Sequence, residues 1–94
     1  MVNREEILKS ALALTTGDRR NSYGSPYINH KRIADIWSVI LEHEVTPSQV
    51  ALCMVGVKLS RLIETPDHTD SFIDGAAYMA IAAEVLENKK GEKL

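Results

Sequence analysis

Apolar residues recur at helical spacing in four separate stretches of this chain, which is the pattern of helices that each bury one face. Capping patterns mark two of the helix starts, because Asn3 is followed three residues later by Glu6, and Thr46 by Gln49. No stretch shows the two-residue alternation of a strand, so the predicted fold class is all-α. The first predicted helix runs from Asn3 to the stop at Thr15-Thr16-Gly17, and the second starts between Pro26 and Asn29 and ends near Glu42. The third runs from Pro47 to the break at 64–69, and the fourth from a cap at Thr69 or Asp70 through Leu86.

The third predicted helix is apolar on nearly every side. Between Val50 and Val57 only Gly56 is not a large or small hydrophobe, so we expect this helix to be central and to contact neighbours all round. Cys53 lies within it and is expected to be a buried small hydrophobe. The third and fourth helices are apolar over more of their circumference than three neighbouring helices can cover, which predicts a homo-oligomer.

A chain of 94 residues is expected to form one compact four-helix domain, here residues 1–87. Glycine, proline and small polar residues between Gly17 and Pro26 predict a long ordered loop between the first and second helices. Residues 88–94 are polar and predict a frayed C-terminal tail. The sequence indicates neither an internal repeat nor a second domain.

Composition limits the partners of such a domain. The formal net charge is -2 and no run of five basic residues occurs, so extended DNA or RNA is not an expected partner. The N-terminal segment is charged and the longest apolar run, 50–57, is too short to cross a bilayer, so neither a signal sequence nor membrane contact is expected. A single cysteine cannot form an internal disulfide, and the expected location is the reducing cytoplasm.

Polar residues set into the apolar third and fourth helices are the first candidates for a site. Two cations three positions apart project from one face of the third helix, and carboxylates and a phenol spaced by four lie along one face of the fourth. A short connection makes these helices antiparallel, which brings cations and carboxylates together near a helix N-terminus that attracts phosphate. These candidates are Lys58, Arg61, His68, Asp70, Ser71, Asp74 and Tyr78.

Structural interpretations of the same residues stay open. Lys58 or Arg61 could pair with Asp74 simply to fix the register of two helices. Asp70 is a typical helix cap, and Tyr78 could fill the core. A structural or regulatory oligomer with an internal salt-bridge network is therefore one alternative function.

A second polar group surrounds the long loop and the start of the second helix. It consists of Arg19, Tyr23, Asn29 and His30. Tyr23 could stack on a planar base, or it could pack the loop down while the arginines stay solvated. The chain holds three histidines, too few and too scattered for a histidine-rich zinc cluster, and no metal site is predicted.

Several short motifs occur together along the chain. They are Tyr23-Gly24-x-Pro26, Asn29-His30, Ile33-Ala34-x-x-Trp37-Ser38, Lys58-x-x-Arg61, and Pro66-x-His68-x-Asp70-Ser71-x-x-Asp74 followed by Tyr78. From about Gly17 to Glu84 the chain thereby resembles a family of small phage and prophage proteins of unknown function. The resemblance implies an α-helical, oligomeric fold and a nucleotide-type ligand. The chain departs from this pattern at Phe72, where tryptophan is usual, and at Gly75-Ala76-Ala77, where a bulkier residue and a shifted glycine are usual.

More distantly, the four-helix pattern is similar to the MazG-like all-α nucleoside triphosphate pyrophosphohydrolases. Those enzymes resemble one another in a Glu-Glu-x-x-Glu helix facing a Glu-x-x-Asp helix, whose carboxylates hold magnesium against the triphosphate. Here Asp70 and Asp74 are one residue too far apart, and the facing helix carries Lys58 and Arg61. This difference favours holding an anionic ligand over cleaving it.

The predicted function is therefore binding of a nucleotide or nucleotide-derived phosphate ligand by a phage-type homo-oligomer, without catalytic residues or a cofactor. Lys58 and Arg61 would hold phosphate, and Asp74 would orient a cation or a ribose hydroxyl. The setting of the family extends this to sequestering a nucleotide signal of host defence. The enzyme alternative is a divergent magnesium-dependent pyrophosphohydrolase using Asp70 and Asp74. The sequence leaves open the ligand, binding versus hydrolysis, the number of subunits and any host target.

Overall fold

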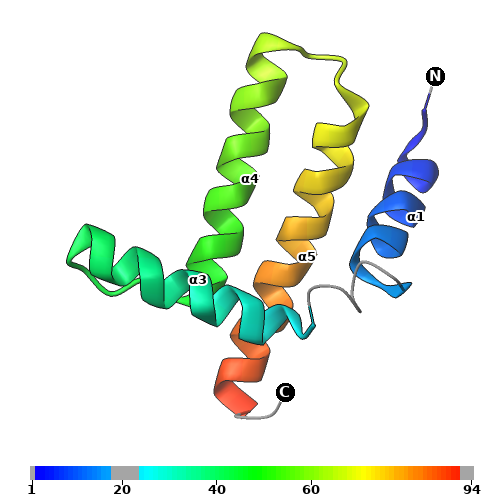
Figure 1. Ribbon diagram of the computed structural model, residues 1–94. Coiled ribbons are helices and arrows are strands. Elements are labelled where there is room, and N and C mark those ends of the chain that lie inside the picture. The colour runs from blue at the N-terminus through cyan, green and yellow to red at the C-terminus, as the bar shows by residue number, and fades with distance from the viewer. Residues whose placement is uncertain (1, 18–23, 92–94) are drawn as a thin grey trace.

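The computed structural model describes residues 2–17 and 24–91, with 87–91 described by their backbone alone. Within these residues the chain is helical and has no strand, which confirms the predicted all-α class. The helices are α1 (Arg4–Thr15), α3 (Pro26–Leu41), α4 (Pro47–Glu64) and α5 (Thr69–Gly91) (Figure 1). α5 continues past its predicted end at Leu86, and most of the predicted long loop lies outside the described residues. None of the described helices is long and apolar enough to span a bilayer.

Capping residues start the helices as the sequence predicts. The side-chain oxygen of Asn3 accepts the backbone N–H of Glu6 at 2.9 Å. At the start of α4, Gln49 donates its backbone N–H to Thr46 Oγ1 at 3.2 Å, and the Thr46 N–H donates to Gln49 Oε1 at 2.9 Å. Each cap pairs an N–H that the helix cannot satisfy itself and contributes about 1 kcal/mol.

The start of α5 differs from the prediction. The helix begins at Thr69, so Thr69 and Asp70 are its first two residues and neither is the cap. The turn after α4 closes early, because the His68 N–H donates to the Thr65 carbonyl and the Ser71 N–H to the His68 carbonyl, each at 3.1 Å. The chain therefore enters the helix directly from His68.

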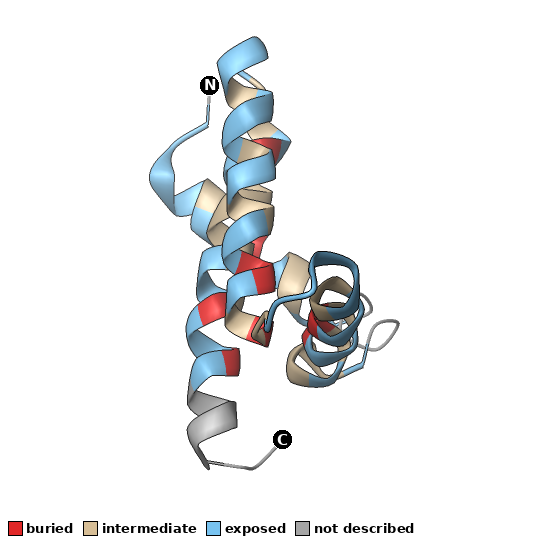
Figure 2. Cartoon of the chain, turned by 90° about the vertical axis from the view of Figure 1, so that its left-hand side faces the viewer, coloured by how far each residue is buried: buried red, intermediate tan, exposed pale blue. Residues whose placement is uncertain are grey.

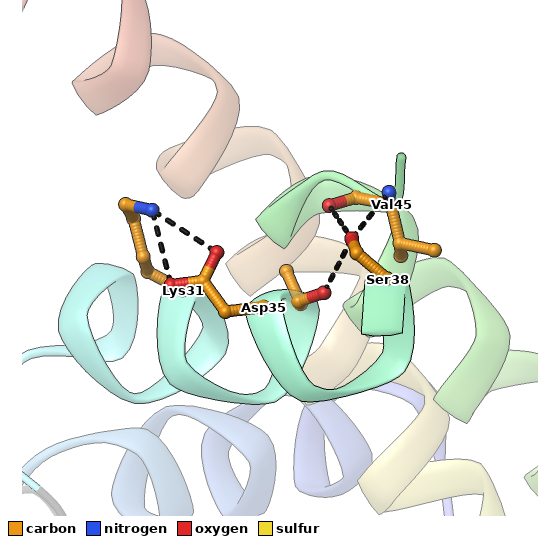
Figure 3. A network of polar contacts seen from close by, with 5 residues as sticks. Lys31, Asp35, Ser38 and Val45 are labelled. Carbon is orange, nitrogen blue, oxygen red and sulfur yellow. Dashed lines mark hydrogen bonds and ion pairs between the residues drawn. The ribbon is translucent and has the colours of Figure 1, made fainter. Parts of the chain in front are cut away.

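Ser38 fixes the turn between α3 and α4. Its hydroxyl donates to the Ala34 carbonyl at 2.7 Å and accepts the Val45 N–H at 2.8 Å (Figure 3). α3 stops at Glu42, whose left-handed backbone (φ 53°) turns the chain out of the helix. Lys31 and Asp35 form an exposed pair at 3.2 Å on the preceding turns of α3 (Figure 3).

α5 is the central helix of the fold. α4 and α5 form an antiparallel pair, α3 crosses the lower end of this pair, and α1 lies beside α5 (Figure 1). α5 thus packs against all three other helices, and the expectation that the helix at 47–64 is central is wrong. The alanines of α5 explain its position, because small side chains such as the buried Ala77 and Ala82 let neighbouring helices approach closely. Among the described residues, Val50 and Val85 are the largest fully buried side chains, so the core is small.

The side of α4 that faces away from α5 is exposed. Figure 2 views the molecule from this side and shows most of the length of α4 as exposed. Of the described helices, α3 and α5 alone pack against α4, and Leu52, Leu59 and Ile63 are exposed in the single chain. Cys53 is also exposed, which corrects the prediction that it is buried. Apolar composition alone did not distinguish a face covered by the same chain from one that is left open.

Candidate cavity between the helices

The predicted site residues fall into two groups in the structure. One group lines a cavity where α3, α4 and α5 meet, and the other forms a hydrogen-bonded network at the turn from α4 to α5. The cavity group is Asn29, His30, Lys58, Asp74 and Tyr78, and the turn group is Arg61, His68 and Ser71. Asp70 is exposed in the first turn of α5 and belongs to neither group. Arg19 and Tyr23 lie outside the residues that the structure describes.

A partly buried ion pair joins α4 to α5 at the cavity wall. Lys58 Nζ lies 3.4 Å from Asp74 Oδ2, and the two side chains are 27% and 31% exposed. The sequence left open whether Lys58 or Arg61 pairs with Asp74, and the structure selects Lys58. Gly75 follows Asp74, and a Cβ built there would lie 4.0 Å from Lys58 Cβ, so the α5 backbone passes close to the lysine stem. Partial burial reduces solvent screening of this pair relative to an ion pair on the surface.

The cavity has a volume of about 280 Å³ and combines apolar and polar lining. α5 contributes four residues, Asp74, Ala77, Tyr78 and Ile81, whose spacing places them on one helix face. Helical spacing could have added Ala77 and Ile81 to the predicted site. The remaining newly found lining residues are Leu14, Thr15, Gly24 and Pro26, which come from the end of α1 and the start of α3. No local signal in the sequence shows that these two segments meet α5.

His30 is a buried residue that lines this cavity and can present a hydrogen-bond acceptor to it. The His30 residue is 5% exposed, and its Nδ1 lies 2.8 Å from the Pro26 carbonyl oxygen. Since a carbonyl only accepts, Nδ1 carries the proton, and in the neutral ring Nε2 is an acceptor. No described residue donates to Nε2. The ring also meets Tyr78 edge to face, with centroids 6.3 Å apart, which fixes both aromatic side chains at the cavity.

The turn group forms a chain of two hydrogen bonds. Arg61 Nη2 lies 3.3 Å from His68 Nε2, and His68 Nδ1 lies 2.7 Å from Ser71 Oγ. Arginine only donates, so Nε2 accepts and Nδ1–H donates to the serine hydroxyl. His68 in this tautomer cannot take the proton of Ser71, and Ser71 is buried. The geometry therefore links the end of α4 to the first turn of α5 and does not activate a nucleophile.

The cavity chemistry is suited to recognition. Its described lining offers one ammonium, one carboxylate, one amide, one imidazole acceptor and a phenol beside apolar side chains. Ligand pockets typically combine an apolar surface with a few such orienting groups, in volumes of about 300–1,000 Å³. Of the described His, Cys, Asp and Glu side chains, no three gather closely enough to hold a metal ion.

Fold and cavity together define a small all-helical protein with an amphipathic cavity between its helices. The chain belongs to the family described as "Domain of unknown function (DUF6378)", whose profile matches residues 6–86. This confirms the predicted membership of a family of unknown function. The more distant similarity to MazG-like enzymes stays a prediction.

Two phage proteins are similar to most of this chain. The Gene 55 protein of Mycobacterium phage D29 is 39% identical over 83 residues, which cover 88% of this chain and 55% of the phage protein. The Gene 55 protein of Mycobacterium phage L5 is 36% identical over 76 residues, covering 80% and 49%. The chain thus spans about half the length of these relatives, and it is a phage-type protein. No solved structure is significantly similar to it.

Proposed function

We propose that this protein binds a nucleotide or nucleotide-derived phosphate ligand in the cavity between α3, α4 and α5. The observation that carries the proposal is the presence in one cavity of a partly buried cation, Lys58, and of a hydrogen-bond acceptor, Nε2 of the buried residue His30. A nucleotide needs both kinds of group, since its phosphate is an anion and its base and ribose carry N–H and O–H donors. The apolar part of the lining supplies a surface for the base.

Each polar group then has a defined task. Lys58 holds a phosphate oxygen through a charge-assisted hydrogen bond. Asp74 accepts a hydrogen bond from a ribose hydroxyl and holds Lys58 in position before the ligand binds. His30 Nε2 accepts an N–H of the base, and the Asn29 amide can donate or accept beside it. Arg61 does not line the cavity, so the proposal assigns the phosphate to Lys58 alone.

Ligand titration with matched lysine variants tests this assignment. The probes are nucleoside mono-, di- and triphosphates, the unphosphorylated nucleosides and inorganic phosphate. Lys58→Gln should weaken nucleotide binding about tenfold to hundredfold, because a charged hydrogen bond contributes about 1.5–3 kcal/mol. Lys9→Gln is the control, since Lys9 also pairs with a carboxylate, Glu5 at 3.1 Å, but lies outside the cavity lining. Equal affinities in both variants, or no binding of any phosphate-bearing probe, would contradict the proposal.

A turnover assay separates binding from hydrolysis. The protein is incubated with nucleoside triphosphates and magnesium, and monophosphate and pyrophosphate are measured. Binding without turnover is the expected result and is what sequestration of a nucleotide signal requires. Release of pyrophosphate that Asp74→Asn abolishes would instead support the magnesium-dependent pyrophosphohydrolase.

A further inference from the structure

One strip of the exposed surface of α4 carries no charge, although Arg61 and Glu64 are exposed beside it. We name as the outer α4 face the exposed residues of α4 that point away from α5, and none of them is charged. They are Gln49, Leu52, Cys53, Gly56, Leu59, Ser60 and Ile63. Ile63 is 84% exposed. The charged residues of α4 are Lys58, Arg61 and Glu64, and helical spacing places all three outside this face. A helix face meant for water normally carries charged side chains.

We infer that the outer α4 face binds a second copy of this chain, with the two α4 helices antiparallel and crossing at Gly56. Leu52, Gly56, Leu59 and Ile63 are spaced four, three and four, which is the spacing of a helix–helix seam. A two-fold axis at Gly56 brings Leu59 beside Leu52 of the partner subunit along one edge of the face, and Ser60 beside Cys53 of the partner subunit along the other edge. Large side chains thus meet along one edge and small ones along the other, so the face matches itself, as a two-fold interface requires.

Gly56 supports close approach of a second helix at this point. Glycine destabilises a helix interior relative to alanine, so its presence needs a reason. Within the chain there is none, because a Cβ built at Gly56 would meet nothing within 4 Å. Gly56 lies midway along the outer α4 face, where a facing backbone would come nearest.

The surface area of the chain agrees with a missing partner. The chain exposes 6769 Å², whereas a compact monomer of 10.4 kDa exposes roughly 5,400 Å². Its radius of gyration is 14.0 Å against about 12.4 Å expected for this length. The surplus of roughly 1,400 Å² exceeds the ~800 Å² that each partner buries in a standard interface.

The projecting half of α3 extends the same interface. α3 reaches beyond α4 on the exposed side of α4 (Figure 1), and its C-terminal half carries the exposed apolar residues Ile36, Val39 and Ile40. In the antiparallel arrangement, the α4 end that carries Ile63 lies next to the α3–α4 junction of the partner subunit. The partner's α3 is then positioned to cover Ile63.

Light scattering on matched variants tests the dimer. The wild-type chain at micromolar concentration should give twice the monomer mass, and Leu59→Lys should reduce this to the monomer mass. Leu12→Lys on α1 is the control, because Leu12 is 64% exposed against 57% for Leu59 and lies outside the outer α4 face. A monomeric wild-type chain, or equal masses for the two variants, would overturn the inference. Circular dichroism confirms that each variant is folded.

Single-cysteine oxidation tests the register. With the axis at Gly56, the two copies of Cys53 lie about 9 Å apart along the helices, beyond the ~7 Å Cα limit of a disulfide. Mild oxidation should therefore rapidly form a disulfide in the double variant Cys53→Ser, Gly56→Cys. It should be slow both in the wild-type chain, through Cys53, and in the double variant Cys53→Ser, Ser60→Cys. Preferential linking at position 53 or 60 would refute the axis at Gly56.

Discussion

The Lys58–Asp74 pair gives the sharpest quantitative prediction, because the chain provides its own control. Lys9–Glu5 has a similar separation, 3.1 Å against 3.4 Å, but its side chains are 73% and 71% exposed against 27% and 31%. Any difference in coupling energy between the two pairs therefore reports burial and not distance. The perturbation is a double-mutant cycle on each pair, with lysine changed to methionine and the acid to its amide.

The expected magnitude follows from the separation and the burial. At 3.4 Å two unit charges attract by ~1 kcal/mol in bulk water and by ~5 kcal/mol at an effective dielectric constant of about 20. Desolvation and the ordering of two long side chains offset much of the larger value. We expect a coupling of about 1–2 kcal/mol for Lys58–Asp74 and of about 0.3–0.5 kcal/mol for the exposed control.

Urea unfolding at one fixed protein concentration measures both couplings, since the stability of an oligomer depends on concentration. Asp74→Asn alone should lower the free energy of unfolding by about 1–3 kcal/mol, because it leaves a partly buried ammonium without its counter-ion. For a domain of this size, each kcal/mol corresponds to roughly 4–8 °C in melting temperature. Equal couplings in the two cycles would refute the assignment of Lys58–Asp74 as an interaction strengthened by burial.

Two further predictions concern the fold. Thr46→Ala should lower the free energy of unfolding by about 1 kcal/mol in the same urea assay, because the Gln49 N–H then loses its acceptor, Thr46 Oγ1. An unchanged midpoint would show that the turn at Ser38 suffices to start α4. Val50→Ala should cost about 2 kcal/mol in a thermal melt, since it removes two fully buried methyl groups and leaves a cavity, whereas Val2→Ala, at an exposed valine outside the proposed dimer interface, should stay within about 0.5 kcal/mol. Similar losses in both valine variants would show that burial of the Val50 side chain is not the source of its cost.

The helix boundaries were predictable because they depend on neighbouring residues. Capping side chains and first-turn prolines act within one turn of the backbone, so the starts at Arg4, Pro26 and Pro47 follow from the sequence alone. The same locality limited the prediction at Thr69, where hydrogen bonds of the preceding turn moved the helix start. Spacing along a helix also predicted that a cation of α4 would meet Asp74, because the periodicity of two antiparallel helices fixes which faces oppose each other.

The cavity depended on contacts that no local pattern encodes. The sequence supplied the polar residues of the cavity but grouped them with Arg61, His68 and Ser71, which bond to one another at the turn. The distinction is decided by which hydrogen-bond partners lie within reach after folding. It is also the reason that the proposed phosphate contact now rests on Lys58.

By itself, the sequence determined the helical class, the starts of α1 and α4, and the periodicity that aligns Lys58 with Asp74, because each is set by interactions within a few turns. Tertiary structure alone decided that the alanine-rich α5 is central, that the end of α1 reaches the cavity, and that one face of α4 is left open. These outcomes depend on how closely helices distant in sequence can approach. Apolar composition indicates that a helix surface is favourable to bury, whereas the folded structure shows which of these surfaces are buried within the chain.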